Sequence, residues 1–584
     1  MDNIVIARHL EETASLLEID GADVFRIRSY RRAAEAVEQQ TTQLATLTTP
    51  DADPKALLAI NGIGKAMAAN IRDLVATGSM PLRDELLTRY RHTMLELLRL
   101  PGMGPKTVAL VWSAFQVSNI DELEAAAKAG QLNTLPRMGD KFTTKLLKGI
   151  EDYRRNSSRF RIDHAREFAD RIAHLILAFP GIESVTPAGS LRRGRETVGD
   201  LDLLATGPAC EPSVVAAAVE HVATLSIIDK LMARGQNKVT FTLSNNLQVD
   251  VRLLPRASYG AALQYFTGSK HHNVALRQRA IKRGLSLSEY ALIRTADNTI
   301  VASETEADIY NALDLDYIPP ELRENSGELE AAAAHTLPNL ITLADIHGDV
   351  HMHTFETDGK CSIREMAEAA IARGRKYIAI TDHSKNLAMT NGMDDKRALA
   401  HAARVREVNA ELEGRIHIFS GIECDILTDG QMDLEDDTLA QLDIVIASVH
   451  SKFDQAIDVM TARVLRALDN PFVRILAHPT GRKLLRRDPY AIDLEQVFTR
   501  AAALGVAVEH NSNPARTDLS DAHMRLAKSL GCKISINTDA HATEEMDHTQ
   551  HGIIQLRRAW LTPADVINTA PTPEAFMALL RQRK

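Results

Sequence analysis

The chain contains few cysteines, few aromatic residues and no apolar run long enough to cross a bilayer. Of 584 residues, four are cysteines and 4% are aromatic. The cysteines are far apart and none stands in a Cys-x-x-Cys spacing, which disfavours both a disulfide framework and a cysteine zinc site. A membrane span needs about twenty consecutive apolar residues. We therefore expect neither export nor membrane insertion, and a reducing cytoplasm fits the cysteine content.

An excess of positive charge is also absent. The formal net charge of −9 excludes a uniformly basic surface, so any contact with nucleic acid has to come from local patches. A chain of this length typically forms about three to five domains. Hydrophobic residues make up 45% of the sequence, enough for several cores. The composition predicts a soluble multidomain protein.

A short phrase occurs three times within the first 155 residues, where apolar spacings of three and four predict helices. The copies are INGIGKAMAANI at 60–71, LPGMGPKTVALV at 100–111 and LPRMGDKFTTKL at 135–146, with Arg137 in place of the first glycine. Each copy predicts a tight turn before a helix, whose free N–H groups suit a phosphate. One such turn is usually a plain connector, whereas three favour DNA-backbone binding, through Gly62, Gly64, Lys65, Gly102, Gly104 and Lys106.

Phosphate-binding and metal-binding residue types come together in GSLRRGRETVGDLD at 189–202. If 198–205 forms a strand, Asp200 and Asp202 share one face while Leu201 and Leu203 enter the core. Asp250, in a second alternating run, offers a third carboxylate. An isolated Asp-x-Asp is more often a turn or strand-edge feature. Beside the Gly-Ser turn and the arginines, however, these acids favour a pair of magnesium-type ions, which combine carboxylates with substrate phosphates.

Together with YFTGSKHHN at 265–273, these residues resemble the nucleotidyltransferase palm of family X DNA polymerases. The resemblance implies an α+β palm and nucleotidyl transfer with two Mg²⁺ or Mn²⁺ ions. It implies four catalytic residues, Asp200, Asp202, Asp250 and Arg193, of which the three aspartates are the metal ligands. The nucleotide-binding residues it implies are Gly189, Ser190, Arg193, Gly199, Tyr265, Phe266, Gly268, Asn273 and Arg277.

The helical repeats resemble the helix-hairpin-helix units of the same family, which bind DNA without reading its sequence. The segment FRIRSYRRAAEAV at 25–37 resembles the basic helix of the family's lyase domain. In that domain a lysine forms a Schiff base, and Asn70 occupies the aligned position here. An amide cannot form an imine. We therefore expect no deoxyribose-phosphate lyase activity, or weak activity if Lys65 or another amine substitutes.

From residue 341 onward, short apolar and β-branched runs repeatedly end in a histidine or an acid, and helical patterns separate them. This alternation predicts a largely parallel sheet, and the remaining length matches one barrel of about 250 residues. In such barrels the chemistry gathers at the carboxyl ends of the strands. A single histidine is usually structural, but many at one strand position predict a polynuclear phosphoesterase with Zn²⁺, Mn²⁺ or Fe.

These runs resemble the polymerase and histidinol phosphatase (PHP) domain, which accompanies family X polymerases in many bacteria and archaea. The resemblance implies a site for three Zn²⁺ or Mn²⁺ ions, with Glu423 bridging two of them. Its implied ligands are His351, His353, Asp358, His383, Glu423, His450, His478, Asp539 and His541. Arg482 or Lys483, just beyond His478, are candidates for phosphate binding, and His510 is unassigned.

The predicted fold class is a multidomain chain with an all-α helix-hairpin-helix region, an α+β palm and an α/β distorted TIM-like barrel. The predicted domains are a lyase-like helical domain at 1–90, a second helical subdomain at 91–158, the palm at 159–258, a nucleotide- and template-contacting subdomain at 259–318, a linker at 319–340 and the PHP domain at 341–584.

The function that the resemblance implies is DNA polymerisation across short gaps in repair, coupled to a 3′-5′ exonuclease or abasic-site endonuclease. Two alternatives remain open. The PHP domain could act as a phosphatase or pyrophosphatase, or the chain could be a DNA-end-binding scaffold with vestigial sites. The expected partners are gapped or nicked DNA and deoxynucleoside triphosphates. We expect a monomer in the cytoplasm, associated with the nucleoid.

Overall fold

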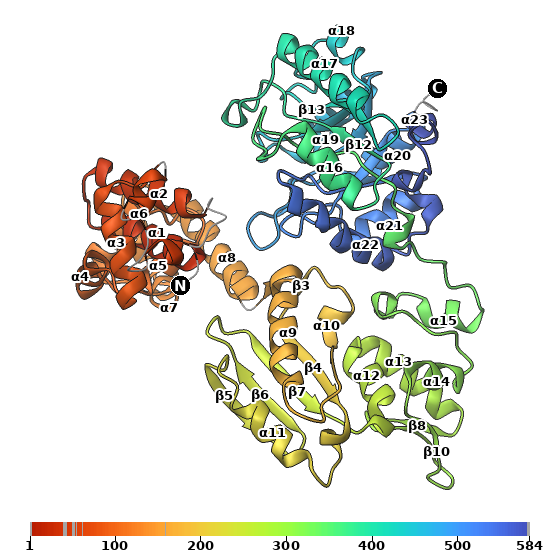
Figure 1. The fold of residues 1–584 in the computed structure, drawn as a ribbon. Coiled ribbons are helices and arrows are strands. Elements are labelled where there is room, and N and C mark those ends of the chain that lie inside the picture. The colour runs from red at the N-terminus through yellow and green to blue at the C-terminus, as the bar shows by residue number, and fades with distance from the viewer. Residues whose placement is uncertain are drawn as a thin grey trace. The chain divides into compact units, whose positions relative to one another are not determined.

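The chain, described by a computed structural model, forms two compact units, 1–157 and 158–584 (Figure 1). The structure describes residues 3–38, 44–48, 53, 55–60, 62–157 and 159–580. Within these ranges, none of the helices combines the length and the apolar character that a bilayer span requires.

The first unit is helical and contains two hydrophobic cores. The predicted turns are present: Gly62 and Gly102 have φ of +98° and +82°, and each stands just before a helix. Arg137 keeps a positive φ of 66°, so the third turn has a left-handed residue without glycine. The helices are α1 (Asn3–Ile19), α2 (Val24–Glu38), α3 (Lys65–Thr77), α4 (Pro81–Arg89), α5 (Met94–Leu97), α6 (Pro105–Phe115), α7 (Ile120–Lys128) and α8 (Asp140–Ser157).

The second unit begins with a five-stranded mixed sheet in the order β2-β4-β7-β6-β5. Its strands are β2 (Ser184–Pro187), β4 (Asp200–Thr206), β5 (Lys230–Arg234), β6 (Lys238–Thr242) and β7 (Gln248–Leu253). The helices α9 (Ile162–Leu177) and α11 (Val215–Ala223) share one core with the sheet. The central strands β4 and β7 run parallel, which places their amino ends side by side. The short helix α10 (Gly189–Arg192) and the strand pair β1 (Phe160–Arg161) and β3 (Thr197–Val198) precede β4.

A smaller subdomain follows, in which helices pack on a three-stranded antiparallel sheet. Its elements are α12 (Tyr259–Thr267), α13 (Lys270–Lys282), β8 (Leu285–Leu287), β9 (Leu292–Arg294), β10 (Ile300–Ala302) and α14 (Glu306–Asn311).

The segment 319–340, for which we predicted a linker, is instead packed against this subdomain. It contains η6 (Pro320–Leu322) and α15 (Glu328–Ala333), and its apolar residues join the same core. Arg323 and Glu328 are fully buried, paired with Glu306 at 2.5 Å and with His272 at 2.7 Å. Because charged residues occupy buried positions here, the segment shows no amphipathic period.

The last part is a barrel of seven parallel strands in chain order, with helices between them. A parallel bridge from Met352 to Ala540 joins the first strand's extension to the last, and His353 N–H donates to the Ala540 carbonyl at 2.8 Å. The strands are β11 (Gly348–Asp349), β12 (Tyr377–Ile380), β13 (His417–Asp425), β14 (Ile444–Ser448), β15 (Val473–Leu476), β16 (Ala507–Asn511) and β17 (Ile534–Asn537).

Its helices are α16 (Ile363–Ala372), α17 (Asp395–Glu411), α18 (Asp436–Leu439), α19 (Ile457–Asp469), α20 (Leu494–Leu504), α21 (Asp521–Ser529), α22 (Thr549–Arg558) and α23 (Pro573–Leu580). The predicted parallel α/β barrel is confirmed.

Candidate metal centres and nucleotide cleft

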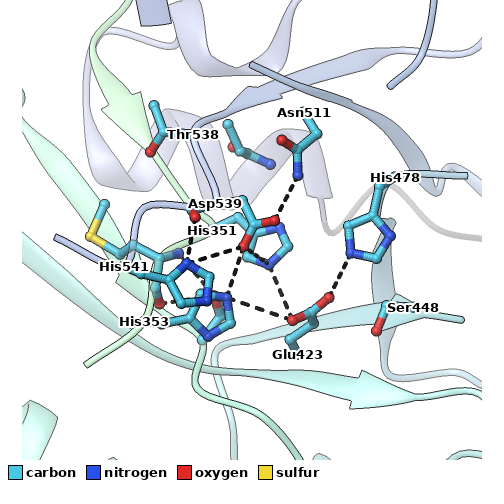
Figure 2. A network of polar contacts seen from close by, with 12 residues as sticks. His351, His353, Glu423, Ser448, His478, Asn511, Thr538, Asp539 and His541 are labelled. Atoms are coloured by element: carbon cyan, nitrogen blue, oxygen red, sulfur yellow. Dashed lines mark hydrogen bonds and ion pairs between the residues drawn. The ribbon is translucent and has the colours of Figure 1, made fainter. Parts of the chain in front are cut away.

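Histidines and acids converge at the carboxyl ends of the barrel strands (Figure 2). Their ligand atoms form three overlapping groups: His353, Asp358, His383 and His541; His351, His353 and Asp539; and His383, Glu423 and His450. Asp358 and His541 are the more exposed members, with about 30% and 27% of their side chains accessible. The cluster is therefore buried at its centre and open at one edge.

Glu423 lies at the centre of this cluster. Its Oε2 lies 2.9 Å from His383 Nδ1, and its Oε1 lies 2.9 Å from His478 Nε2. His450 Nε2 is 3.3 Å from the same Oε1. One carboxylate whose two oxygens face different histidines has the geometry to serve two ions. His478, which belongs to none of the three groups, joins the cluster through this contact.

The buried nitrogens fit metal ions better than they fit hydrogen bonds. His351 Nε2 is buried with no hydrogen-bond partner among the described residues. It lies 3.4 Å from Glu423 Oε2 and 3.6 Å from Asp539 Oδ1, too far for strong hydrogen bonds. A donor set of imidazoles and carboxylates without thiolate suits Zn²⁺ or Mn²⁺. These residues could therefore hold divalent ions.

A second layer of acids orients the histidines. Glu509 accepts from His351 Nδ1 at 2.7 Å, and Asp425 from His450 Nδ1 at 2.5 Å, so Nε2 of each ring points to the cluster. Asp382 accepts from Thr354 N and Oγ1, at 2.8 and 2.7 Å, and thereby holds the loop that carries Asp358. We predicted no role for these acids, although Asp425 shares a strand face with Glu423.

The pKa values of the histidines in the cluster depend on the neighbouring carboxylates and on burial. Burial lowers the pKa of His351, but Glu509, Asp539 and Glu423 outweigh this and hold that pKa well above its ordinary value. Burial, with His541 and His383, lowers the pKa of His353 to about 4. His353 is thus neutral near pH 7, the form that binds metals.

The basic residues that lie beside the cluster are only partly the ones that we expected from the sequence. Arg516, which the sequence did not mark, places Nε 3.3 Å from Asp539 Oδ2. Burial, and then repulsion from Arg516, lower the pKa of Lys483, so these two cations lie near each other. Arg482 instead forms an ion pair with Glu196 at 2.5 Å. Its role as a phosphate ligand therefore stays a prediction, in which a phosphate has to compete with Glu196 for the guanidinium.

The three palm acids share one face of the five-stranded sheet. Asp202 on β4 pairs in register with Asp250 on β7, while Leu201 and Leu203 are fully buried on the other face. Lys238 Nζ lies 2.6 Å from Asp250. Burial, and then repulsion from Asp200 and Asp250, raise the pKa of Asp202 to about 7. Such a concentration of negative charge fits divalent cations.

A cleft of about 680 Å³ opens beside these acids. Four predicted residues line it, Ser190, Arg193, Gly199 and Asp200, together with Arg159, Arg195, Gln248, Ser269, Lys270, His271 and Glu324. Gly189 has φ of +57°, and a Cβ there would lie 2.4 Å from Asp202 Oδ2. Glycine is thus required for the close approach between the turn and the acid.

The other predicted nucleotide-binding residues lie beside this cleft rather than along its lining. Asn273 donates to the Tyr265 carbonyl at 2.7 Å, and Arg277 Nε donates to the Asn273 carbonyl at 3.3 Å. The Arg252 guanidinium lies over the Phe266 ring at 4.4 Å. A Cβ on Gly268 would lie 3.1 Å from Arg193 Nη1. The bond from Asn273 connects α13 to α12, and the contact of Arg252 with Phe266 connects β7 to α12.

The predicted DNA-binding residues of the helical unit lie at two helix starts. Gly64 precedes the first residue of α3, Lys65, and Gly104 precedes α6, in which Lys106 is the second residue. Both lysines are exposed. The N–H groups of these helix starts are not used by a side-chain cap.

Metal binding by the palm acids should weaken as the pH falls below 7. Because the pKa of Asp202 is raised to about 7, an ion arriving at lower pH has to displace a proton. Calorimetry of Mg²⁺ binding in two buffers of different ionisation enthalpy should detect about one released proton at about pH 6 and almost none at about pH 8. Asp202→Asn is the control and should remove this difference; an equal proton release at both pH values would contradict the assignment.

Four family models match the chain: a helix-hairpin-helix domain at 1–80, a SAM-like helix-hairpin-helix tandem at 94–152, a DNA polymerase beta thumb at 262–324 and a PHP domain at 349–479. A probable phosphatase from Thermoanaerobacter sp. (strain X514) is 29% identical over 232 residues, 38% of this chain and 89% of the relative. DNA polymerase lambda of Rattus norvegicus is 24% identical over 347 residues, 55% of this chain and 56% of the relative.

The DNA polymerase/3′-5′ exonuclease PolX of Bacillus subtilis (strain 168) is 37% identical over 577 residues, which cover 98% of each chain. The helical unit, the palm, the thumb match and the barrel therefore occur in one relative in the same order. Together with the acids on β4 and β7 and the histidine cluster of the barrel, this shows that the chain belongs to family X of the DNA polymerases, in the group that carries a PHP domain.

Proposed function

We propose that this protein is a DNA polymerase that fills short gaps during repair, joined to a metal-dependent 3′-5′ exonuclease. The observation that carries the polymerase is the shared face of Asp200, Asp202 and Asp250 beside a cleft lined by Ser190 and Arg193. The polymerase/exonuclease relative matches over nearly its whole length, which supports both activities.

In the palm, Asp200, Asp202 and Asp250 would hold two Mg²⁺ or Mn²⁺ ions. Such ions lower the proton affinity of the attacking 3′-hydroxyl and stabilise charge on the leaving diphosphate. Ser190 and Arg193 bind the triphosphate in the cleft. Asp250 is oriented by Thr240, which donates to it at 2.6 Å. Phosphoryl transfer needs little more from the protein than this positioning.

In the barrel, the nine predicted ligands would hold three Zn²⁺ or Mn²⁺ ions, which supply Lewis acidity and lower the pKa of water. Glu423 holds the centre of the group, and Glu509 and Asp425 fix the ring orientation of His351 and His450. Arg516 and Lys483 bind the scissile phosphate. DNA reaches the cluster at its open edge, beside Asp358 and His541.

The helix starts at Gly64 and Gly104, with Lys65 and Lys106, bind the phosphates of gapped or nicked DNA without reading its sequence. The proposed domains are 1–90, 91–158, 159–258 and 341–584, with 259–340 as one subdomain because the apolar residues of 319–340 join its core. The protein acts as a monomer in the cytoplasm, at the nucleoid, on DNA and deoxynucleoside triphosphates.

The decisive experiment is a gapped duplex with a labelled primer, incubated with and without nucleotides across Mg²⁺, Mn²⁺ and Zn²⁺. We expect extension to the end of the gap with nucleotides, and stepwise shortening of the 3′ end without them. A duplex that is bound but neither extended nor shortened would leave only a DNA-end-binding scaffold. An abasic duplex in the same series tests cleavage at abasic sites.

A phosphatase or pyrophosphatase is the second candidate for the barrel, because a probable phosphatase matches with 89% of its length. A labelled 3′ overhang, pyrophosphate and a small phosphoester, offered separately to metal-loaded protein, distinguish the two. Hydrolysis of the small compounds with an intact overhang would replace the exonuclease.

Deoxyribose-phosphate lyase activity should be absent or weak. Asn70 donates to the Tyr30 hydroxyl at 2.8 Å, and its amide nitrogen cannot form the imine that this chemistry needs. Borohydride reduction in the presence of a 5′-deoxyribose-phosphate end should therefore trap no protein–DNA adduct. Strong trapping that disappears in Lys65→Met would identify Lys65 as the substitute amine and contradict this expectation.

A further inference from the structure

Residues 193–196 form a turn that joins two parts of the polymerase site. On one side are Ser190 and Arg193, which line the cleft, and on the other is Asp200. The turn thus connects the end of α10 to the strands β3 and β4. Side chains of the barrel contact it at three places.

The helix α22 of the barrel makes the first two contacts. Arg558 donates to the Arg193 carbonyl at 2.7 Å, and Gln555 donates to the Gly194 carbonyl at 2.8 Å. Both side chains are only 2% exposed. A Cβ on Gly194, whose φ is +69°, would lie 2.1 Å from Ile554. The helix and the turn are thus in direct contact, without room for a larger residue.

Arg558 also reaches the partner of Arg193. It donates to Glu324 at 3.1 Å, and the same carboxylate oxygen accepts from Arg193 Nε at 3.1 Å. Asp521 of the barrel accepts from the other end of Arg558 at 2.8 Å. Asp521 thus fixes the Arg558 guanidinium. That guanidinium in turn holds the backbone carbonyl of Arg193 and the carboxylate of Glu324, which is the ion-pair partner of Arg193.

The third contact connects the turn to the metal cluster. Arg482 pairs with both oxygens of Glu196, at 2.5 and 3.2 Å. It follows Gly481, whose N–H donates to the carbonyl of the candidate ligand His478 at 2.9 Å. The turn is thus held at both ends, by α22 and by the loop after β15.

We propose that the barrel positions the nucleotide site of the polymerase, with Arg558 as the principal positioning residue and Gln555 and Arg482 supporting it. The proposal rests on the proposed polymerase function and deepens it. The cleft has its full set of contacts only when α22 lies against the turn. Synthesis then depends on the barrel even where no DNA is being cleaved.

The test is Arg558→Met, which keeps most of the side-chain volume and removes the donors. Without them, the Arg193 carbonyl loses its bond from Arg558 and Glu324 loses one of its two guanidinium partners, so the turn is held less firmly. A small displacement of positioning groups can cost up to ~10²-fold; we expect KM for the nucleotide to rise about tenfold, with a smaller change in kcat. Exonuclease activity of the same sample should stay within about twofold, because no barrel ligand contacts Arg558.

Lys528→Met is the matched control. Lys528 also donates to a backbone carbonyl and a carboxylate, of Trp560 and Asp565, both at 2.9 Å, but both acceptors belong to the barrel. It should leave KM for the nucleotide unchanged. Arg558→Lys, which keeps the charge and can still reach one acceptor, should recover part of the loss.

An unchanged KM in an Arg558→Met sample that retains exonuclease activity would overturn the proposal. If Arg558→Met does not fold, Gln555→Met decides, since it loses only the bond to Gly194: a raised KM supports the proposal and an unchanged one overturns it. Failure of the unaltered protein to extend any primer would instead remove the proposed polymerase function.

Discussion

Asp202→Asn is expected to lower nucleotide incorporation on a gapped duplex by about 10³-fold, the scale on which a group that stabilises transition-state charge acts. The amide keeps the shape of the side chain but removes the charge that faces Asp200 and Asp250. Repulsion between this charge and the other two carboxylates destabilises the folded protein when no metal is bound. Removing the charge should therefore not lower the melting temperature. Single-turnover incorporation in Mg²⁺ measures the effect.

Two measurements make this prediction specific. The exonuclease activity of Asp202→Asn should equal that of the unaltered protein, since the barrel cluster is built from other strands. Asp229→Asn, just before β5 and outside the acid group, should incorporate nucleotides normally. Incorporation by Asp202→Asn within about tenfold of the unaltered rate would contradict a two-metal palm.

Glu423→Gln is expected to lower 3′-end shortening by about 10³-fold and to leave synthesis within about twofold. In the unaltered protein, His383 and His478 each lie 2.9 Å from an oxygen of this carboxylate. In the variant an amide nitrogen, which cannot ligate an ion, would replace one of these oxygens. The bound zinc and manganese content, measured by mass spectrometry, should fall in parallel. Labelled overhangs in Mn²⁺ give the rate.

The matched control is Asp443→Asn. Asp443 is also a barrel acid, and it accepts from Ser420 N and Oγ at 2.9 and 2.7 Å, on the same strand as Glu423. It should keep both its metal content and its exonuclease rate. Loss of synthesis together with shortening in Glu423→Gln, at unchanged melting temperature, would contradict two separate active sites.

Local periodicity was sufficient to predict the parts of both sites that lie on strands. Asp200 and Asp202 alternate with Leu201 and Leu203, so their common face follows from the pleat of one strand. In the barrel, each apolar run ends in its own polar residue, and the rule that parallel strands end together places the residues in one cluster.

Residues whose role depends on a distant partner could not be predicted in this way. Glu509 was visible as an acid at a strand end, but its bond to His351 spans 158 positions. Arg482 stood beside a metal-binding motif, and only the fold shows that Glu196, 286 positions away, is its partner. Buried ion pairs also hid the packing of 319–340, because charge at a core position resembles a solvent-exposed loop in the sequence.

The closure of the barrel has a consequence for how this protein is made. His353 Nε2 lies 3.1 Å from Asp539 Oδ1, although 186 positions separate the two residues in the chain. A ribosome completes the helical unit and the palm long before it reaches β17, and non-local contacts form late in folding. The metal cluster of the barrel is therefore among the last parts of the molecule to assemble, and a nascent chain that stops short of residue 539 lacks one of the candidate ligands at its centre.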